Sequence, residues 1–207
     1  MSELDNKERI LAKASQLFMQ FGIRSVSMDD IASALGVSKK TIYQFFADKD
    51  ELVSEVIKVI IAESEECCEV DRTVAENAVD EMFKAMEMVE EMFRTMNPAV
   101  LHDLKKYHPA AFGIFDKHKN DYVYNIIRDN LVRGIQEELY RPELNIEIIT
   151  LMRIDSMMLP FNPTLFNRQD ISIVQISQQI LEHYLFGIVS LKGYKLVLKY
   201  QQQRQKK

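Results

Sequence analysis

The chain has 207 residues, enough for one or two domains with a substantial buried core. Hydrophobic residues make up 47% of it, which favours a globular fold, and no run approaches the roughly 20 apolar residues of a membrane-spanning helix. The formal net charge of −5 excludes a uniformly basic nucleic-acid-binding protein, so any contact with DNA must come from a local basic surface.

The first predicted element is an amphipathic helix over residues 6–21. Its apolar side chains recur every three or four positions along one face. They are Ile10, Leu11, Ala14, Leu17, Phe18 and Phe21. Gly22 ends this helix, and we expect the apolar face to close a three-helix core with the two short helices that follow.

Two short helices joined by a tight turn are predicted next. Ser27 stands at a helix start with Asp29 and Asp30 in the first turn, which suits an N-cap and the helix dipole. Gly36 ends that helix, since glycine enters the left-handed conformation of a C-terminal cap at little cost. Ser38 then caps a second helix that begins at the next residue. Helices connected this closely cross at a steep angle, which predicts a helix-turn-helix.

The second of these helices is expected to present polar side chains outward. Ile42 and Phe46 share its inner face by their i, i+4 spacing. The side chains expected to point away from the core are Lys39, Lys40, Thr41, Tyr43 and Gln44. Two ammonium groups, a hydroxyl, a phenol and an amide suit phosphates and base edges in a DNA major groove. Ordinary solvent-exposed residues on a helical hairpin are the alternative interpretation of the same pattern.

The N-terminal quarter carries a set of short motifs in a fixed order. They are Gly22, Ser27, Ile31-Ala32, Gly36-Val37-Ser38, Tyr43-Gln44-Phe45-Phe46 and Lys49-Asp50-Glu51-Leu52. As a set, they resemble the TetR family (tetracycline-repressor-like) of bacterial transcription regulators. Two positions depart from the family pattern: Lys40 stands where many members have glycine, and Phe45 stands where histidine or tyrosine is frequent.

The resemblance implies contacts with double-stranded DNA. Contacts to phosphate are implied for Ser27, Thr41, Tyr43 and Lys49. Contacts to base edges are implied for Lys39, Lys40 and Gln44. Arg24 and Ser38 complete the candidate DNA-binding set, because Arg24 adds local positive charge and Ser38 begins the reading helix.

The body of the chain is predicted to be helical throughout. A helix over residues 50–66 follows the motif without a linker. The resemblance implies that it transmits displacement between the helix-turn-helix and the C-terminal helices. A break is predicted at residues 67–72 and a long helix over residues 73–96. A short helix over residues 97–106 and another long one over residues 108–139 come next.

Two later helices, over residues 143–158 and 170–191, are expected to pair two copies of the chain. The second carries apolar residues on more than one side, which indicates burial on two sides. The resemblance implies that these two helices from each subunit form a four-helix dimer interface. A short last helix is expected to follow Gly193.

The helices of the body are rich in methionine and phenylalanine. Methionine is flexible and polarisable, so it suits a pocket for varied apolar ligands, although the same residues also suit an ordinary core. The candidate ligand-binding residues are Met82, Met86, Phe93, Met96, His102, Phe112, Phe115 and Tyr122. The resemblance implies a small apolar or amphipathic effector.

No catalytic, metal-binding or cofactor-binding motif occurs in the sequence. None of the four histidines stands at a metal-binding spacing, and the nucleotide-binding loops and the GxSxG elbow are absent. Cys67 and Cys68 are adjacent and therefore poor partners for an intrachain disulfide. This cysteine usage favours a reducing, cytoplasmic location.

The sequence therefore predicts an all-α, non-enzymatic, dimeric DNA-binding transcription regulator without a cofactor. Residues 1–52 are expected to form the helix-turn-helix domain and residues 53–207 a helical ligand-binding and dimerisation domain. The expected partners are a double-stranded DNA operator, a small-molecule effector that releases repression and a second copy of the chain, with no membrane. Two alternatives stay open. One is a regulator whose body binds a protein or no ligand, and the other is an all-α small-molecule carrier or enzyme that uses a Met/Phe-rich cavity and has no DNA role.

Overall fold

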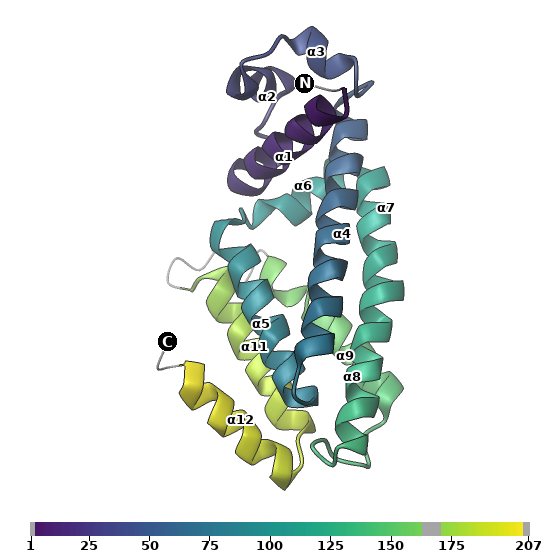
Figure 1. The fold of residues 1–207 in the computed structure, drawn as a ribbon, viewed down its shortest axis with the longest axis vertical. Coiled ribbons are helices and arrows are strands. Elements are labelled where there is room, and N and C mark those ends of the chain that lie inside the picture. The colour runs from purple at the N-terminus through teal and green to yellow at the C-terminus, as the bar shows by residue number, and fades with distance from the viewer. Residues whose placement is uncertain (1–2, 163–170, 205–207) are drawn as a thin grey trace. The chain divides into compact units, whose positions relative to one another are not determined.

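The computed structural model of the chain describes residues 3–162 and 171–204. Within these ranges the secondary structure is helical, and the extended pairing is limited to an isolated bridge between Tyr140 and Val189 (Figure 1). The all-α prediction is therefore confirmed. Among the described helices, none combines the length and apolar character needed to cross a membrane.

Three helices open the chain, and they are α1 (Glu3–Phe21), α2 (Met28–Leu35) and α3 (Lys39–Tyr43). Ser27 caps α2 in a complete capping box, because its hydroxyl accepts from the Asp30 N–H while its own N–H donates to the Asp30 carboxylate at 2.8 Å. Gly36 ends α2 with a φ of 68°, in the left-handed region. The Ser38 hydroxyl accepts from the Thr41 N–H at 3.1 Å and caps α3. The predicted helix-turn-helix is therefore present.

The remaining elements are α4 (Lys49–Val74), α5 (Ala78–Thr95), α6 (Ala99–Tyr107), α7 (Pro109–His118), the π-helix η1 (Lys119–Val123), α8 (Tyr124–Gln136), α9 (Ile146–Ser156), the 3-10 helix η2 (Leu159–Phe161), α11 (Ile173–Ile188) and α12 (Leu191–Arg204). α7, η1 and α8 follow one another without interruption. The long helix predicted over residues 108–139 is thus present as one helical run that contains a turn of π-helix, a feature that a regular apolar spacing does not indicate.

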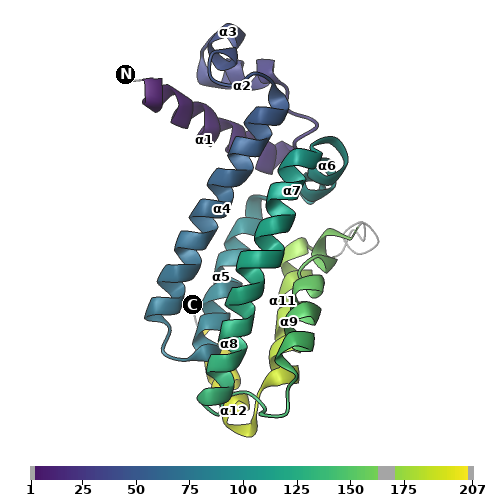
Figure 2. The same cartoon turned by 90° about the vertical axis from the view of Figure 1, so that its right-hand side faces the viewer.

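By its internal contacts the chain divides into two compact units. Unit 1 comprises residues 1–65 and 95–118, and unit 2 comprises residues 66–94 and 119–207. The core of unit 1 includes Phe18, Ile31, Ile42, Phe46 and Leu52. The core of unit 2 includes Leu131, Tyr140, Tyr184, Leu185 and Ile188. α4 contributes residues to both units, and α8 lies beside α9 within unit 2 (Figure 2).

The break predicted at residues 67–72 is wrong, because α4 continues through this stretch to Val74. The stretch contains neither glycine nor proline, so nothing in its backbone opposes a helix. The boundary lies further on, where the Asn77 side chain accepts from the N–H groups of Val79 and Asp80 at 3.1 and 3.0 Å. The helix predicted over residues 73–96 accordingly begins only at Ala78.

The C-terminal helices also differ in their bounds from the prediction. α9 lies inside the predicted range 143–158, and α11 lies inside 170–191, a range whose first residue is outside the described residues. Ser172 caps α11 in a capping box with Gln175. Gly193 lies within α12 rather than before it. The glycine serves packing and not a helix boundary, because a Cβ at this position would lie 2.1 Å from the Leu139 carbonyl oxygen.

Candidate nucleic-acid interface and ligand groove

The helix-turn-helix of unit 1 exposes most of the predicted DNA-binding side chains. Those exposed to solvent are Arg24, Ser27, Ser38, Lys39, Lys40, Tyr43 and Gln44. Thr41 and Lys49 are partly buried. On the inner face of α3, Ile42 is 0% exposed and Phe46, which follows the helix, is 1% exposed. α3 is therefore held by apolar contacts on one side and carries its polar groups on the other.

The lysines of α3 differ in their electrostatic surroundings. Lys39 Nζ lies 2.9 Å from a carboxylate oxygen of Asp29, and this hydrogen bond raises the pKa of Lys39. Both side chains are well exposed, so the pair is weak and a phosphate can replace the carboxylate. Lys40, Tyr43 and Gln44 make no side-chain hydrogen bond or ion pair among the described residues, so they are available to a partner.

Lys49 lies in a different environment from the other candidates. Its Nζ donates to the Ile23 carbonyl oxygen at 2.6 Å and lies 5.7 Å from the centre of the Phe18 ring. Burial lowers the pKa of Lys49, although nearby carboxylates oppose this effect. In this structure the ammonium group holds the α1–α2 connection to the start of α4, and a contact with phosphate requires it to release the carbonyl group.

Helix α6 also holds the α1–α2 connection. The Arg24 N–H donates to the Asp103 carboxylate at 2.9 Å, and the Asn97 N–H donates to the Met19 carbonyl oxygen at 2.6 Å. The Arg24 guanidinium lies 5.2 Å from the centre of the Tyr107 ring. Asp103 is absent from the predicted site residues. The available signal for it was a carboxylate at an inward position of a short amphipathic helix, beside Leu104.

The eight predicted ligand-binding residues are divided between the two units. Met82, Met86, Phe93 and Tyr122 belong to unit 2, and Met96, His102, Phe112 and Phe115 belong to unit 1. Most of them are ordinary core residues. In unit 1, Met96, Phe112 and Phe115 pack against the core, whereas His102 is exposed. In unit 2, Met82 and Met86 belong to the core. Phe93 packs edge-to-face against Phe161, and the Tyr122 hydroxyl donates to Glu69 at 3.2 Å.

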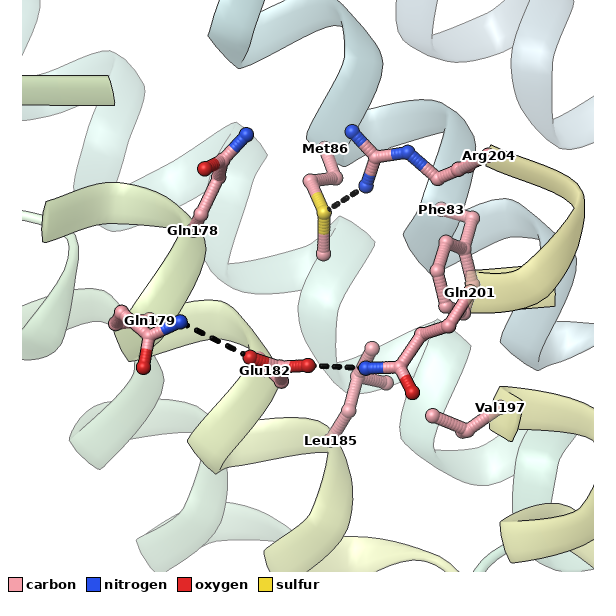
Figure 3. A pocket seen from close by; sticks show the side chains of 9 residues that line it. All are labelled: Phe83, Met86, Gln178, Gln179, Glu182, Leu185, Val197, Gln201 and Arg204. Atoms are coloured by element: carbon pink, nitrogen blue, oxygen red, sulfur yellow. Dashed lines mark hydrogen bonds between the residues drawn. The ribbon is translucent and has the colours of Figure 1, made fainter. Parts of the chain in front are cut away.

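Unit 2 contains a groove between α5, α11 and α12, with a volume of about 400 Å³ (Figure 3). Its buried apolar floor consists of Phe83, Met86, Leu185 and Val197. Its more exposed polar rim consists of Gln178, Gln179, Glu182, Gln201 and Arg204. Of the predicted ligand-binding residues, Met86 alone lines this groove. A volume of this size falls in the range typical of small-molecule sites.

The two charged side chains of the rim differ in whether an opposite charge compensates them. Arg204 Nη2 donates to both carboxylate oxygens of Glu90, at 2.6 and 2.7 Å, so the positive charge of this arginine is compensated. Its guanidinium also contacts the sulfur of Met86. The Glu182 carboxylate accepts from the amide of Gln179 at 3.1 Å and from the amide of Gln201 (Figure 3). Within the described part of the chain, no lysine or arginine pairs with Glu182.

The histidines lie in separate surroundings. In unit 1, the His108 ring contacts the Asp50 carboxylate and the His118 ring lies 3.0 Å from the Glu65 carboxylate. His102 and His183 are exposed. Among residues 3–162 and 171–204, no three His, Cys, Asp or Glu side chains are grouped so that they could hold a metal ion.

A stretch near the start of the chain matches a known family. The family model described as bacterial regulatory proteins, tetR family, matches residues 10–56. This stretch holds most of α1, all of α2 and α3 and the first turns of α4. It therefore contains the capped α2–α3 pair and the exposed polar face of α3.

Relatives extend the similarity beyond this stretch. The uncharacterized HTH-type transcriptional regulator YvaF of Bacillus subtilis (strain 168) is 28% identical over 190 residues, which cover 88% of this chain and 95% of that protein. The HTH-type transcriptional repressor KstR2 of Mycobacterium tuberculosis is 23% identical over 152 residues, which cover 68% and 72% of the two chains. A putative transcriptional regulator from Saccharomonospora viridis, crystallised in complex with choline, shares the fold with a TM-score of 0.73 at 16% identity over 91% of this chain and 100% of its own. The chain belongs to the tetR family of bacterial regulatory proteins and is a DNA-binding transcriptional regulator.

Proposed function

We propose that this regulator binds a double-stranded DNA operator as a homodimer and is released from it by a small apolar or amphipathic effector. Helix α3 carries the proposal, because Ile42 is buried on its inner face while Lys40 and Gln44 are exposed and unpaired among the described residues. We assign residues 1–52 to DNA binding and residues 53–207 to ligand binding and dimerisation. The protein then acts in the cytoplasm, on chromosomal DNA.

The exposed side chains divide into two classes by what they would recognise. Tyr43 is 44% exposed, and its phenol suits a phosphate oxygen, as do the hydroxyls of Ser27 and Thr41. Lys40 suits the acceptor atoms of guanine, and the Gln44 amide can bond adenine through two hydrogen bonds. The first class would set affinity for any duplex, and the second would set sequence preference.

Helix α9 supports the pairing of two copies. Ile148, Leu151 and Met152 stand on one side of it and are 62%, 51% and 50% exposed. Contiguous exposed apolar side chains mark interaction surfaces. On α11, Phe186 is also exposed. We therefore assign the dimer interface to regions 143–158 and 170–191. A dimer formed in this way would present two α3 helices to major grooves about 34–36 Å apart, or a multiple of that distance.

The relatives support control by a ligand. KstR2 is named as a repressor, and the S. viridis regulator was crystallised with choline, as properties of those two proteins. In this chain α4 begins in unit 1 and ends in unit 2, as does the continuous run of α7, η1 and α8, so a change in unit 2 would act on unit 1 through these helices. An effector acts only if it binds the two states with different affinity. The alternative of a carrier or enzyme without a DNA role finds no support among these relatives.

Fluorescence anisotropy tests the DNA-binding face, with a duplex selected from random sequences by the full-length protein. Tyr43→Ala is expected to weaken binding to every duplex about tenfold, the loss of one hydrogen bond to a charged group. Gln44→Ala is expected to relax base preference at one position while changing general affinity less. Gln20→Ala, an exposed substitution on α1, is the control and should bind as the parent does. If Tyr43→Ala binds like this control, the assigned face is wrong.

A further inference from the structure

We propose that the groove between α5, α11 and α12 is the effector site, and that its ligand is a small organic cation with an apolar body. This inference rests on the ligand response proposed above and adds its location and the chemical class of the ligand. The groove lies wholly within unit 2. Its lining comes from α5 and from the consecutive helices α11 and α12, which are far from α5 in the sequence.

The floor of the groove suits the apolar body of such a ligand. Phe83 and Met86 from α5 are 5% and 6% exposed, and Leu185 from α11 is 1% exposed. Phe83 is also tilted against Tyr200, with ring centres 5.4 Å apart, so its position is fixed by packing. Methionine adapts its shape to different ligands because its side chain is flexible and polarisable. The floor therefore selects for apolar bulk without selecting one shape.

The rim of the groove determines the sign of the ligand's charge. Arg204 is compensated by Glu90, whereas Glu182 has amide partners but no cationic partner in the described part of the chain. One negative charge thus remains over an apolar floor, where a charge-assisted hydrogen bond is stronger than in bulk water. An anionic ligand would have to separate Arg204 from Glu90 and would still face Glu182.

The amide groups of the rim also suit an ammonium group. Gln179 and Gln201 each donate one N–H to the Glu182 carboxylate, so their orientation is fixed by it (Figure 3). Gln178 lies one turn before Glu182 on α11 and lines the same opening. A protonated amine carries several donors, and the carboxylate together with the amide oxygens of this rim supplies acceptors for them.

A series of three ligands that differ only in charge tests this proposal. 4-Phenylbutylammonium, 4-phenylbutanol and 4-phenylbutyrate share one aromatic body and differ in the terminal group. Isothermal titration calorimetry with the full-length protein at neutral pH is expected to show the cation binding about tenfold more tightly than the alcohol, and the anion most weakly. Absence of cation binding, or binding of the anion as tight as that of the cation, overturns the proposal.

Two substitutions locate the cation. Glu182→Gln preserves the size of the side chain and removes its charge, so the affinity for the cation should fall to that for the alcohol. Gln178→Arg places a guanidinium one turn from Glu182. This guanidinium should compensate the carboxylate and so remove the preference for the cation over the alcohol. Glu91→Gln and Gln202→Arg make the same charge changes at exposed positions outside the groove and should leave the preference intact. A cation preference that survives both groove substitutions overturns the proposal.

Release from the operator is measured separately, by fluorescence anisotropy of the bound duplex. The proposed control by a ligand and the proposed cation site can therefore fail independently. Calorimetric binding of the cation that leaves the protein on its DNA supports the cation site and refutes release by a ligand there. Release of DNA by the anion in the Glu182→Gln protein and the parent alike supports control by a ligand and overturns this groove as the effector site.

Discussion

Replacing Gly134 by alanine tests the packing that joins the end of α8 to the start of α5 within unit 2. A Cβ on Gly134 would lie 2.0 and 2.2 Å from the Cδ2 and Cε2 atoms of Tyr140. The Tyr140 side chain is 1% exposed, and its hydroxyl lies 3.0 Å from both the Ala78 carbonyl oxygen and the side-chain oxygen of Asn130. The ring cannot move away without breaking these hydrogen bonds, so the added methyl group must displace a fixed neighbour.

Three effects determine how much the Gly134→Ala substitution costs. Overpacking of a core costs about 1–3 kcal/mol, and a buried hydroxyl group that loses its partner costs about 1–3 kcal/mol more. Replacing glycine by alanine within a helix stabilises the folded state by about 0.5–1 kcal/mol, which opposes the other two effects. The free energy of unfolding should therefore fall by about 3 kcal/mol. For a chain of this size that corresponds to a melting temperature lower by roughly 6–12 °C.

Thermal unfolding followed by far-ultraviolet circular dichroism measures this change. Gly113→Ala is the matched control, because Gly113 lies within α7 and a Cβ there meets no atom within 4 Å. The control should be as stable as the parent protein or more stable by up to about 1 kcal/mol. Equal melting temperatures for the two variants would refute the reasoning, since Tyr140 would then yield to the methyl group at no cost.

Three further predictions follow from individual contacts. Asp29→Asn removes the carboxylate that Lys39 must leave when it meets DNA, so it should tighten binding to every duplex by a few-fold in titrations at several salt concentrations, because an exposed ion pair is weak. Ser27→Ala removes the N-cap of α2 and should lower the melting temperature by about 2–4 °C at neutral pH. The Ser27 hydrogen bonds lower the pKa of Asp30 from its ordinary value of 3.8, so the part of the stabilisation that comes from the Asp30 carboxylate is present above that pH and is lost as the pH falls through the folded-state pKa. Acid titration should show the difference between the parent and the variant narrowing below about pH 4, without closing, because the bond from the Asp30 N–H to the Ser27 hydroxyl does not titrate. Glu138→Gly should raise the melting temperature by about 1–3 °C, because glutamate there has a φ of 61° that glycine adopts without strain.

The helix-turn-helix could be predicted because its determinants are local in the chain. The hydroxyls of Ser27 and Ser38 accept from N–H groups three residues ahead, and Gly36 takes the left-handed conformation at the end of its own helix. Such contacts form between neighbours along the chain and need no knowledge of the tertiary packing. The apolar spacing that buries Ile42 is local in the same sense.

The end of α4 could not be predicted in the same way. The stretch 67–72 changes in composition but contains no residue that stops a helix. The start of α5 is determined partly by Asn77, which is local, and partly by Glu137, whose carboxylate accepts from the Ala78 N–H at 2.8 Å. Glu137 lies at the end of α8, so its role depends on how two helices distant in the sequence pack together.

The chemistry of the groove depends on packing more strongly still. Glu90 and Glu182 are both glutamates on amphipathic helices, and nothing in the spacing of either helix distinguishes them. They differ because Arg204, from the far end of the chain, reaches Glu90 while Glu182 receives amides. Which carboxylate keeps its charge uncompensated is thus decided by the position of α12. A variant that moves the guanidinium from Glu90 to Glu182 would therefore remove the cation preference of the groove without altering a residue of its apolar floor.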